Sequence, residues 1–189
     1  MYGLILAGGQ SSRMGQPKSL IDYHGKPQYL FLQDLLMPYC EEVFISCKPE
    51  QEHWFSPCPT LPDNGMFGDI GPMGGVLSAF EVYDGPWLVV GCDYPYLRTE
   101  DLNWLLEHRN TIALATVFEH PESSMLEPLI GVYESSAGVR MREAHALGEQ
   151  SLRRFLKFDR VEKVAPLTVD CLRSVDDKEG RQRFLGKNH

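Results

Sequence analysis

The sequence has little of what a membrane, secreted or zinc-binding protein needs. It contains no run near the roughly 18 consecutive apolar residues that a membrane-spanning helix requires. The apolar run at the N-terminus has no basic segment before it and is too short for a signal peptide. The five cysteines include no Cys-x-x-Cys pair, and the six histidines show no i, i+4 pairing and no clustering with cysteine. We therefore predict a cytoplasmic protein with reduced thiols and neither a membrane span nor a zinc site.

Positive charge is scarce as well. The 26 Asp and Glu residues outnumber the 18 Lys and Arg residues, which gives a formal net charge of −8. A nucleic-acid binder usually carries a basic face, so the charge argues against this class of protein. An acidic protein still binds an anionic substrate when its cations are concentrated at one site and a metal ion neutralises part of the substrate charge. The few places where cations gather are therefore the candidate sites.

Linkers, internal repeats and low-complexity tracts are also missing. The apolar fraction is 43%, as in globular proteins. A chain of 189 residues buries about 70% of its unfolded surface, enough for a sizeable core. We predict one domain over residues 1–189.

The most informative stretch lies at the start of the chain. Residues Leu4 to Leu6 are an apolar run, typical of a strand that is buried on both faces. Gly8 and Gly9 then allow a tight turn in which backbone N–H groups converge on phosphate oxygens. Arg13 and Lys18 follow, and both side chains bind phosphates well. The order of these features predicts a strand that leads into a phosphate-binding loop.

Spacing excludes two common nucleotide-binding loops. The P-loop requires Gly-Lys-Ser/Thr, but Gly15 is followed by Gln16 and Pro17. The dinucleotide fingerprint requires glycines that are two and then three residues apart, and Gly8, Gly9 and Gly15 do not have this spacing. The loop therefore belongs to another class.

Two further stretches favour a nucleotide site. Trp87 to Val90 reads as a central strand that delivers Asp93 at its carboxyl end, where ligands bind in open α/β sheets. One carboxylate in that position suits Mg²⁺, which commonly takes one or two carboxylates and substrate phosphates. The glycine-rich loop from Asp63 to Gly75 leads into a helix that begins near Pro72, and such a helix start is a natural anion site.

Apolar runs alternate with helical patterns along the chain, which predicts an α/β fold with a mostly parallel sheet. The expected strands are 4–6, 42–47, 60–62, 87–90, 112–118, 128–133, 161–165 and 168–172. The expected helices are 27–37, 49–55, 72–82, 99–106 with Thr99 as N-cap, 137–147, 152–156 capped by Ser151, and 176–185. The polar segment between His120 and Glu127 is expected over the substrate side.

A second group of cations consists of Arg153, Arg154 and Lys157. It fits either a solvated helix face or a dock for a second phosphorylated substrate.

The segment from Leu6 to Leu20 reads LAGGQSSRMGQPKSL, and it resembles the signature of the nucleotidyltransferases, most of all the molybdenum cofactor guanylyltransferases. The resemblance continues in the Gly-Pro-x-Gly-Gly end of the Asp63–Gly75 loop, in Cys-Asp-x-Pro at Cys92–Pro95, and in Glu-Pro-Leu-Ile-Gly-Val-Tyr at Glu127–Tyr133. It implies a Rossmann-like three-layer α/β/α domain of the nucleotide-diphospho-sugar transferase type.

The resemblance also implies an activity, which is Mg²⁺-dependent transfer of GMP from GTP to the phosphate of molybdopterin or molybdenum cofactor, with release of pyrophosphate. Molybdoenzymes or their chaperones would be partners. Arg13, Lys18 and Asp93 would be the catalytic residues, with Asp93 on Mg²⁺. The nucleotide-binding residues would be Leu6, Ala7, Gly8, Gly9, Lys18, Ser46, Asp63 and Asp93.

The sequence departs from the family at two places. Ser46 stands where the family often has asparagine, which affects one base or ribose contact. Residues Ser174 to Asp177 replace an Asn-x-Asn-Thr segment, and there Asp176 could approach the metal instead. We therefore group Asp176 with Arg153 and Arg154 as candidates for the second substrate or a second metal.

Three other functions fit the same loop. Cytidylyl transfer to the same pterin is one, although Ala7-Gly8-Gly9 favours guanine because the cytidylyl relatives more often show Leu-Ala-Ala-Gly. Nucleotidyl transfer to a sugar phosphate is another. The third is a non-catalytic module that binds GTP or pterin, for which the metal carboxylate Asp93 would be unnecessary.

Overall fold

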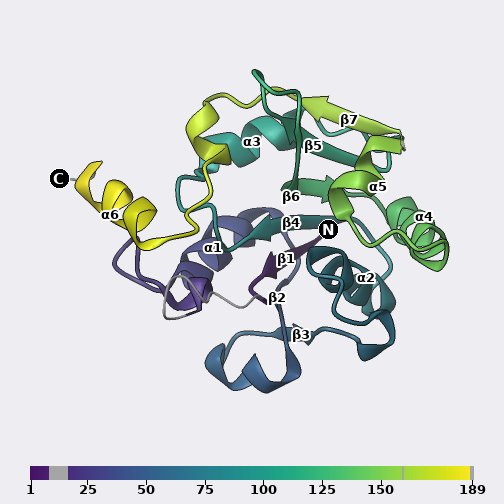
Figure 1. The fold of residues 1–189 in the computed structure, drawn as a ribbon, viewed down its shortest axis with the longest axis horizontal. Coiled ribbons are helices and arrows are strands. Elements are labelled where there is room, and N and C mark those ends of the chain that lie inside the picture. Colours follow the sequence, from purple (N-terminus) through teal and green to yellow (C-terminus); the bar gives the residue numbers. More distant parts are fainter. Residues whose placement is uncertain (9–16, 159, 188–189) are drawn as a thin grey trace.

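The computed structural model describes residues 1–8, 17–158 and 160–187, apart from a few side chains. Seven strands form one sheet in the order β3-β2-β1-β4-β6-β5-β7 (Figure 1). The strands are β1 (Tyr2–Leu6), β2 (Val43–Cys47), β3 (Thr60–Pro62), β4 (Trp87–Gly91), β5 (Ala115–Glu119), β6 (Leu126–Tyr133) and β7 (Val161–Val164). Only β6 runs antiparallel to its neighbours, β4 and β5, among the described pairs. The carboxyl ends of β1, β2, β3 and β4 therefore meet at one edge.

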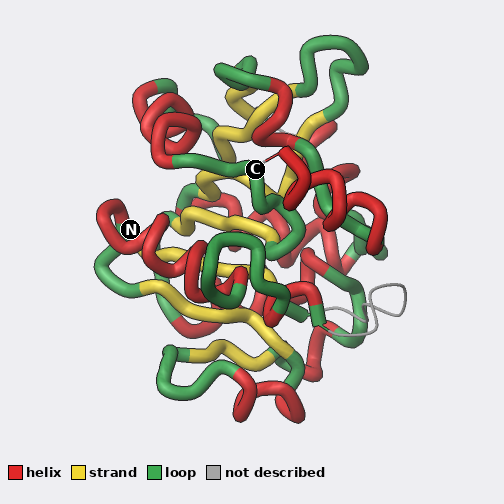
Figure 2. Tube along the Cα trace, turned by 90° about the vertical axis from the view of Figure 1, so that its left-hand side faces the viewer, coloured by secondary structure: helices red, strands yellow, loops and turns green. Residues whose placement is uncertain are grey.

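Helices cover both faces of this sheet. The α-helices are α1 (Gln28–Leu36), α2 (Pro72–Val82), α3 (Thr99–Glu107), α4 (Ser135–Ala146), α5 (Leu152–Phe158) and α6 (Lys178–Lys187). The short 3₁₀ helices are η1 (Lys18–Leu20), η2 (Met37–Tyr39), η3 (Pro49–Trp54), η4 (Gly65–Phe67) and η5 (Val169–Leu172). Figure 2 shows the strands stacked through the middle of the molecule. None of the helices in the described part of the chain is long and apolar enough to cross a membrane.

Two hydrophobic clusters separate the layers, one on each face of the sheet. Leu4 and its neighbours on one face pack against α2, α4 and α5, whereas Ile5 and its neighbours on the other face pack against α1 and α3. Both residues are fully buried, as expected for a strand without polar alternation. The predicted Rossmann-like α/β/α architecture with a mostly parallel sheet is confirmed.

The predicted strand over 168–172 is wrong. Residues Val169–Leu172 form the 3₁₀ helix η5, in which Cys171 N–H donates to the carbonyl of Thr168 and Arg173 N–H to that of Asp170. Only Cys171 of η5 is buried. Local hydrogen bonds therefore replace those of a strand pair.

Two predicted boundaries also change. The strand expected from Ile112 begins at Ala115, because Asn110 accepts from Ile112 N–H with its side chain (3.1 Å) and from Ala113 N–H with its carbonyl (3.1 Å). This local turn is a common use of asparagine. Thr99 is the first residue of α3 rather than its N-cap, a position that Arg98 occupies.

Candidate active site

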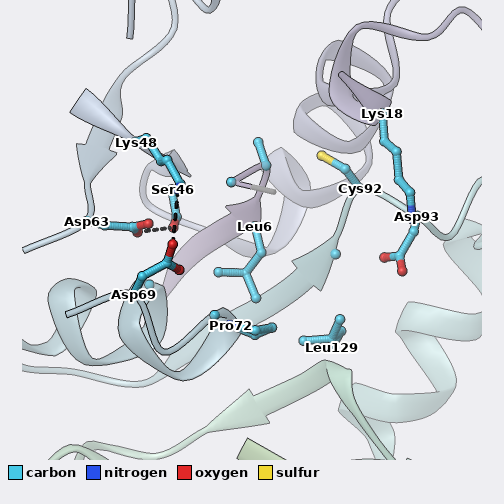
Figure 3. Close-up of a pocket in the computed structure, with 15 residues that line it drawn as sticks. Leu6, Lys18, Ser46, Lys48, Asp63, Asp69, Pro72, Cys92, Asp93 and Leu129 are labelled. Atoms are coloured by element: carbon cyan, nitrogen blue, oxygen red, sulfur yellow. Dashed lines mark hydrogen bonds and ion pairs between the residues drawn. The ribbon is translucent and has the colours of Figure 1, made fainter. Parts of the chain in front are cut away.

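A cavity of about 540 Å³ opens at the edge where the parallel strands end (Figure 3). The register of the sheet creates it, because Leu6 at the end of β1 lies beside Ser46 of β2 and Gly91 of β4. The cavity in Figure 3 has a group of polar side chains at each of its two ends. Lys48, Ser46, Asp63 and Asp69 gather at one end, and Lys18 and Asp93 lie at the other.

The residues predicted to bind nucleotide come together here. Those that the structure describes all line the cavity: Leu6, Ala7, Gly8, Lys18, Ser46, Asp63 and Asp93. Gly9 and Arg13 lie outside the described residues. The signal for Asp93 was its position after a strand, and that for Ser46 was the family resemblance. Parallel pairing of both strands with β1 puts the two residues at one edge.

Asp93 lies two residues beyond β4 and is anchored by the backbone. Cys92 N–H donates to the carbonyl of Leu6 (3.2 Å), and the carbonyl of Asp93 accepts from Val175 N–H (2.8 Å). Burial raises the pKa of the Asp93 carboxyl to about 6, while the charge of Lys18 opposes this rise. The carboxylate is therefore held in a poorly solvated position, where a cation would stabilise it.

Glycine at position 91 leaves room for this carboxylate. A Cβ on Gly91 would lie 2.6 Å from Oδ1 of Asp93 and 3.3 Å from Cβ of Leu129. Both distances are shorter than ordinary contacts between such atoms. The absence of a side chain at the end of β4 is therefore a condition for the observed position of Asp93.

Lys18 forms an ion pair with Asp176, which comes from the segment between η5 and α6. Ser174 Oγ also donates to Asp176, at 2.7 Å. The charge of Asp176 contributes to the raised pKa of Asp93, so the two carboxylates are near each other. The structure thus brings Asp176, a candidate from the sequence, to the Lys18 end of the cavity.

Asp63 lies at the end of the cavity opposite Lys18 and Asp93. Its backbone N–H donates to the carbonyl of Cys47 (2.9 Å), which continues the pairing of β3 with β2. Ser46 Oγ donates to Asp63 Oδ1 (3.1 Å). Burial raises the pKa of the Asp63 carboxyl, and the hydrogen bond from Ser46 and the charge of Lys48 counteract the rise.

Lys48 and Asp69 line the cavity, but sequence reasoning missed both of them. Lys48 Nζ donates to Asp69 Oδ2 at 3.1 Å. The signal for Lys48 was present, because it follows β2 directly and lies two residues after Ser46. Asp69 lies in the glycine-rich loop and had no comparable signal.

A second cavity of about 500 Å³ adjoins the first and shares Pro72, Asp93 and Leu129 with it. Arg153 lines this second cavity, and its guanidinium is 3.9 Å from Glu127. Arg154 instead pairs with Glu149 (3.2 Å) and lines a different hollow. Consecutive residues of a helix point in different directions, so the structure brings only one of the two arginines to the Asp93 side.

The chain has clear relatives among known proteins. Residues 3–164 match the family of MobA-like NTP transferase domains. A molybdenum cofactor guanylyltransferase of Pseudomonas putida is 30% identical over 173 residues, which are 89% of this chain and 88% of that protein. A molybdenum cofactor biosynthesis bifunctional protein of Synechocystis is 37% identical over 153 residues, which are 78% of this chain. The match covers 43% of the Synechocystis protein, so the chain spans less than half of its length.

A solved structure has the same fold. The crystal structure of molybdopterin-guanine dinucleotide biosynthesis protein A from Archaeoglobus fulgidus superposes with a TM-score of 0.80. The alignment covers 100% of this chain and 98% of that one, at 18% sequence identity. At this identity the likeness is one of fold.

Proposed function

The chain belongs to the family of MobA-like NTP transferase domains, and from this membership we propose that it transfers GMP from GTP to the terminal phosphate of molybdopterin, with or without molybdenum, and releases pyrophosphate. One observation supports the proposal above the others. A single cavity has Lys18 and the buried carboxylate of Asp93 at one end, Asp63 with the Lys48–Asp69 pair at the other end, and a neighbouring cavity that shares Asp93. This arrangement suits a nucleoside triphosphate and an acceptor that meet at Asp93.

The charges suggest how GTP would lie. Lys18 and Asp93 suit the triphosphate, because an ammonium attracts phosphate oxygens and a carboxylate holds a metal between them. Asp63 suits the base, because its carboxylate accepts hydrogen bonds and guanine presents N1–H and N2–H donors on one edge.

Mg²⁺ fits the donor set at the Lys18 end. Within residues 1–8, 17–158 and 160–187 no group of three or more His, Cys, Asp and Glu side chains is placed to hold a metal. Mg²⁺ does not need such a group, since one or two carboxylates and substrate phosphates suffice. We propose that Asp93 holds the ion, with Asp176 as a second carboxylate nearby. When bound, Mg²⁺ would neutralise negative charge on the triphosphate.

Apart from the metal, the residues of the site would act by positioning the acceptor phosphate and the triphosphate. The acceptor phosphate is already an anion, so no strong general base is required to start in-line attack on the α-phosphorus. Lys18 would exchange its ion pair with Asp176 for contacts to phosphate oxygens, and Arg153 would hold the acceptor phosphate in the adjoining cavity. Fixing both phosphates on either side of Asp93 lowers the entropic part of the barrier and stabilises the developing charge.

The proposal is tested by thermal-shift measurements with GTP, CTP, ATP and UTP, each with and without Mg²⁺. A ligand at about 100 times its dissociation constant adds roughly 2.7 kcal/mol to the free energy of unfolding. We expect GTP with Mg²⁺ to give the largest shift, and pyrophosphate release to require molybdopterin. A larger shift with CTP would favour cytidylyl transfer, and no shift with any nucleotide would contradict the proposal.

Gly91→Ala is expected to slow pyrophosphate release by about 10²-fold, because the new Cβ displaces the Asp93 carboxylate and a displacement near 1 Å has effects of this size. Gly85→Ala is the matched control, since its Cβ would meet only Tyr2 ring atoms at 3.6 Å and 3.7 Å. Steady-state rates and melting temperatures of the two variants are compared. Wild-type turnover in Gly91→Ala would show that Asp93 does not need its observed position.

A further inference from the structure

The base end of the first cavity contains a cation that the proposed function has not used. Lys48 lines the cavity, and its side chain is 29% exposed. Its ammonium donates to Asp69 at 3.1 Å and lies close enough to Asp63 to lower the pKa of that carboxyl. Figure 3 shows Lys48 next to Ser46 and on the same side of the cavity as both carboxylates.

Ser46 is poorly placed to contact a base. Its hydroxyl donates to Asp63 Oδ1 at 3.1 Å, so its one proton is already used. A Cβ on Gly75 would lie 2.5 Å from Ser46 Oγ, which means that the backbone of α2 closes over the hydroxyl. Ser46 therefore orients Asp63, and a donor to the base has to come from another residue.

Lys48 has the donors that Ser46 lacks. An ammonium carries three N–H groups and no acceptor. Asp69 accepts from this ammonium and raises its pKa, so the group is charged at neutral pH and only donates. The Asp69 side chain is 80% exposed and lies in the loop before α2, and its ion pair with Lys48 holds the ammonium at the rim of the cavity.

Guanine matches a carboxylate and an ammonium placed side by side. Its N1–H and N2–H groups are donors, and its O6 and N7 atoms are acceptors. Asp63 would accept from the donors while Lys48 donates to O6. A purine with an amino group at position 6 would place a donor against the ammonium, and the mismatch would weaken binding.

We propose that Lys48 selects the base of the nucleotide by donating to the 6-oxo oxygen of guanine, and that Asp69 is the positioning residue that holds Lys48 there. The inference rests on the proposed function, because it assumes that the cavity binds GTP with the base beside Asp63.

The test measures dissociation constants for GTP, ITP and the triphosphate of 2,6-diaminopurine riboside by titration calorimetry, with Mg²⁺ at constant ionic strength. ITP keeps O6 and N1–H and lacks the 2-amino group. The diaminopurine nucleotide keeps the 2-amino group, replaces O6 with an amine and has an acceptor in place of N1–H. The preference is the ratio of the dissociation constants of the diaminopurine nucleotide and GTP. Lys48→Met is expected to reduce this ratio by about 10- to 100-fold. In Lys48→Met the ratio of the dissociation constants of GTP and ITP is expected to stay at the wild-type value. Asp63→Asn is expected to change that ratio, because Asp63 accepts from the 2-amino group that ITP lacks.

Three further variants make the result specific. Lys48→Arg keeps a donor and is expected to retain most of the wild-type preference. Asp69→Asn, at an exposed position, removes the partner of Lys48 and is expected to narrow the preference by a smaller factor. Lys163→Met is the matched control, because Lys163 pairs with Glu119 at the same 3.1 Å distance on β7 and does not line the cavity.

The outcomes separate the two proposals. Wild-type protein that binds GTP, with an unchanged preference in both Lys48→Met and Asp69→Asn, would overturn the role of Lys48 and leave the proposed function intact. An equal narrowing in Lys163→Met would also overturn it, since the effect would then be one of overall charge. Wild-type protein that binds none of the three nucleotides would overturn the proposed function, and this inference with it.

Discussion

Asp93→Asn is expected to slow pyrophosphate release by about 10²- to 10³-fold, the usual effect of removing one group that stabilises transition-state charge. Asparagine has nearly the same shape but cannot supply a negatively charged ligand to Mg²⁺. The effect should appear mainly in the rate at saturating GTP and Mg²⁺, and as a higher Mg²⁺ requirement. Initial rates over a range of Mg²⁺ concentrations measure both quantities.

The same substitution is expected to stabilise the fold at neutral pH. The pKa of Asp93 rises from 3.8 to about 6 on folding, so the folded state binds the proton more tightly than the unfolded state. Ionised Asp93 therefore destabilises the protein, and the cost develops as the pH rises from about 4 to 6. The shift corresponds to on the order of 3 kcal/mol. Without divalent cations, Asp93→Asn should melt above the wild type near pH 8, and the difference should vanish below about pH 4.

Asp34→Asn is the matched control for both effects. Asp34 is exposed and pairs with Lys26, away from the cavity, so neither turnover nor the pH dependence of melting should change. Near-normal turnover in a folded Asp93→Asn protein would contradict the assignment of Asp93 to the metal. A lower melting temperature of Asp93→Asn near pH 8 would contradict the idea that its carboxylate is held in an unfavourable position.

Lys18→Met is expected to reduce kcat/KM for GTP by about 10²- to 10³-fold, because it removes a cation from the end of the cavity where we propose that the triphosphate binds. A second effect separates this role from a structural one. Lys18 lowers the pKa of Asp93, so its removal should raise that pKa above about 6. The residual activity of Lys18→Met should then be lost at a higher pH than wild-type activity when the solution is acidified.

Lys26→Met provides the comparison for Lys18→Met, since it removes a lysine of the same region that pairs with Asp34. Its pH profile and kcat/KM should match those of the wild type. The contrary outcome is that Lys18→Met loses turnover while its activity still falls at the same acidic pH as that of the wild type. In that case Lys18 would act on the phosphates alone, and Asp93 would titrate independently of it.

Local pattern was sufficient for most of the secondary structure. The apolar runs predicted β1 and β4, and Pro72 was correctly expected in the first turn of α2. Ser151 caps α5 as predicted, because its Oγ accepts from Arg154 N–H (3.3 Å). The prediction failed at 168–172, where a strand was expected but the backbone N–H groups donate to carbonyls within the same turn. Strand propensity carries little information where no neighbouring strand is available.

The candidate site could be predicted where its residues sit on regular elements. Asp93 follows from the end of β4, since parallel strands bring such positions to one edge, and Ser46 followed from the family resemblance. Lys48 was missed, because nothing local indicates that its ammonium donates to Asp69 and acts on the charge of Asp63. Arg154 was grouped with Arg153 because the two are adjacent in sequence, and the helical geometry of α5 separates them.

The sequence by itself determined the strand and glycine turn at the N-terminus, the position of Asp93 beyond β4 and the family to which the chain belongs, because short-range pattern and residue type carry this information. Only the tertiary structure decided that Lys18 meets Asp176, a partner 158 residues away, and that Asp63 faces the opposite end of the same cavity. Contacts at such separations depend on strand order and helix packing, which are set by burial of the whole chain rather than by any local segment.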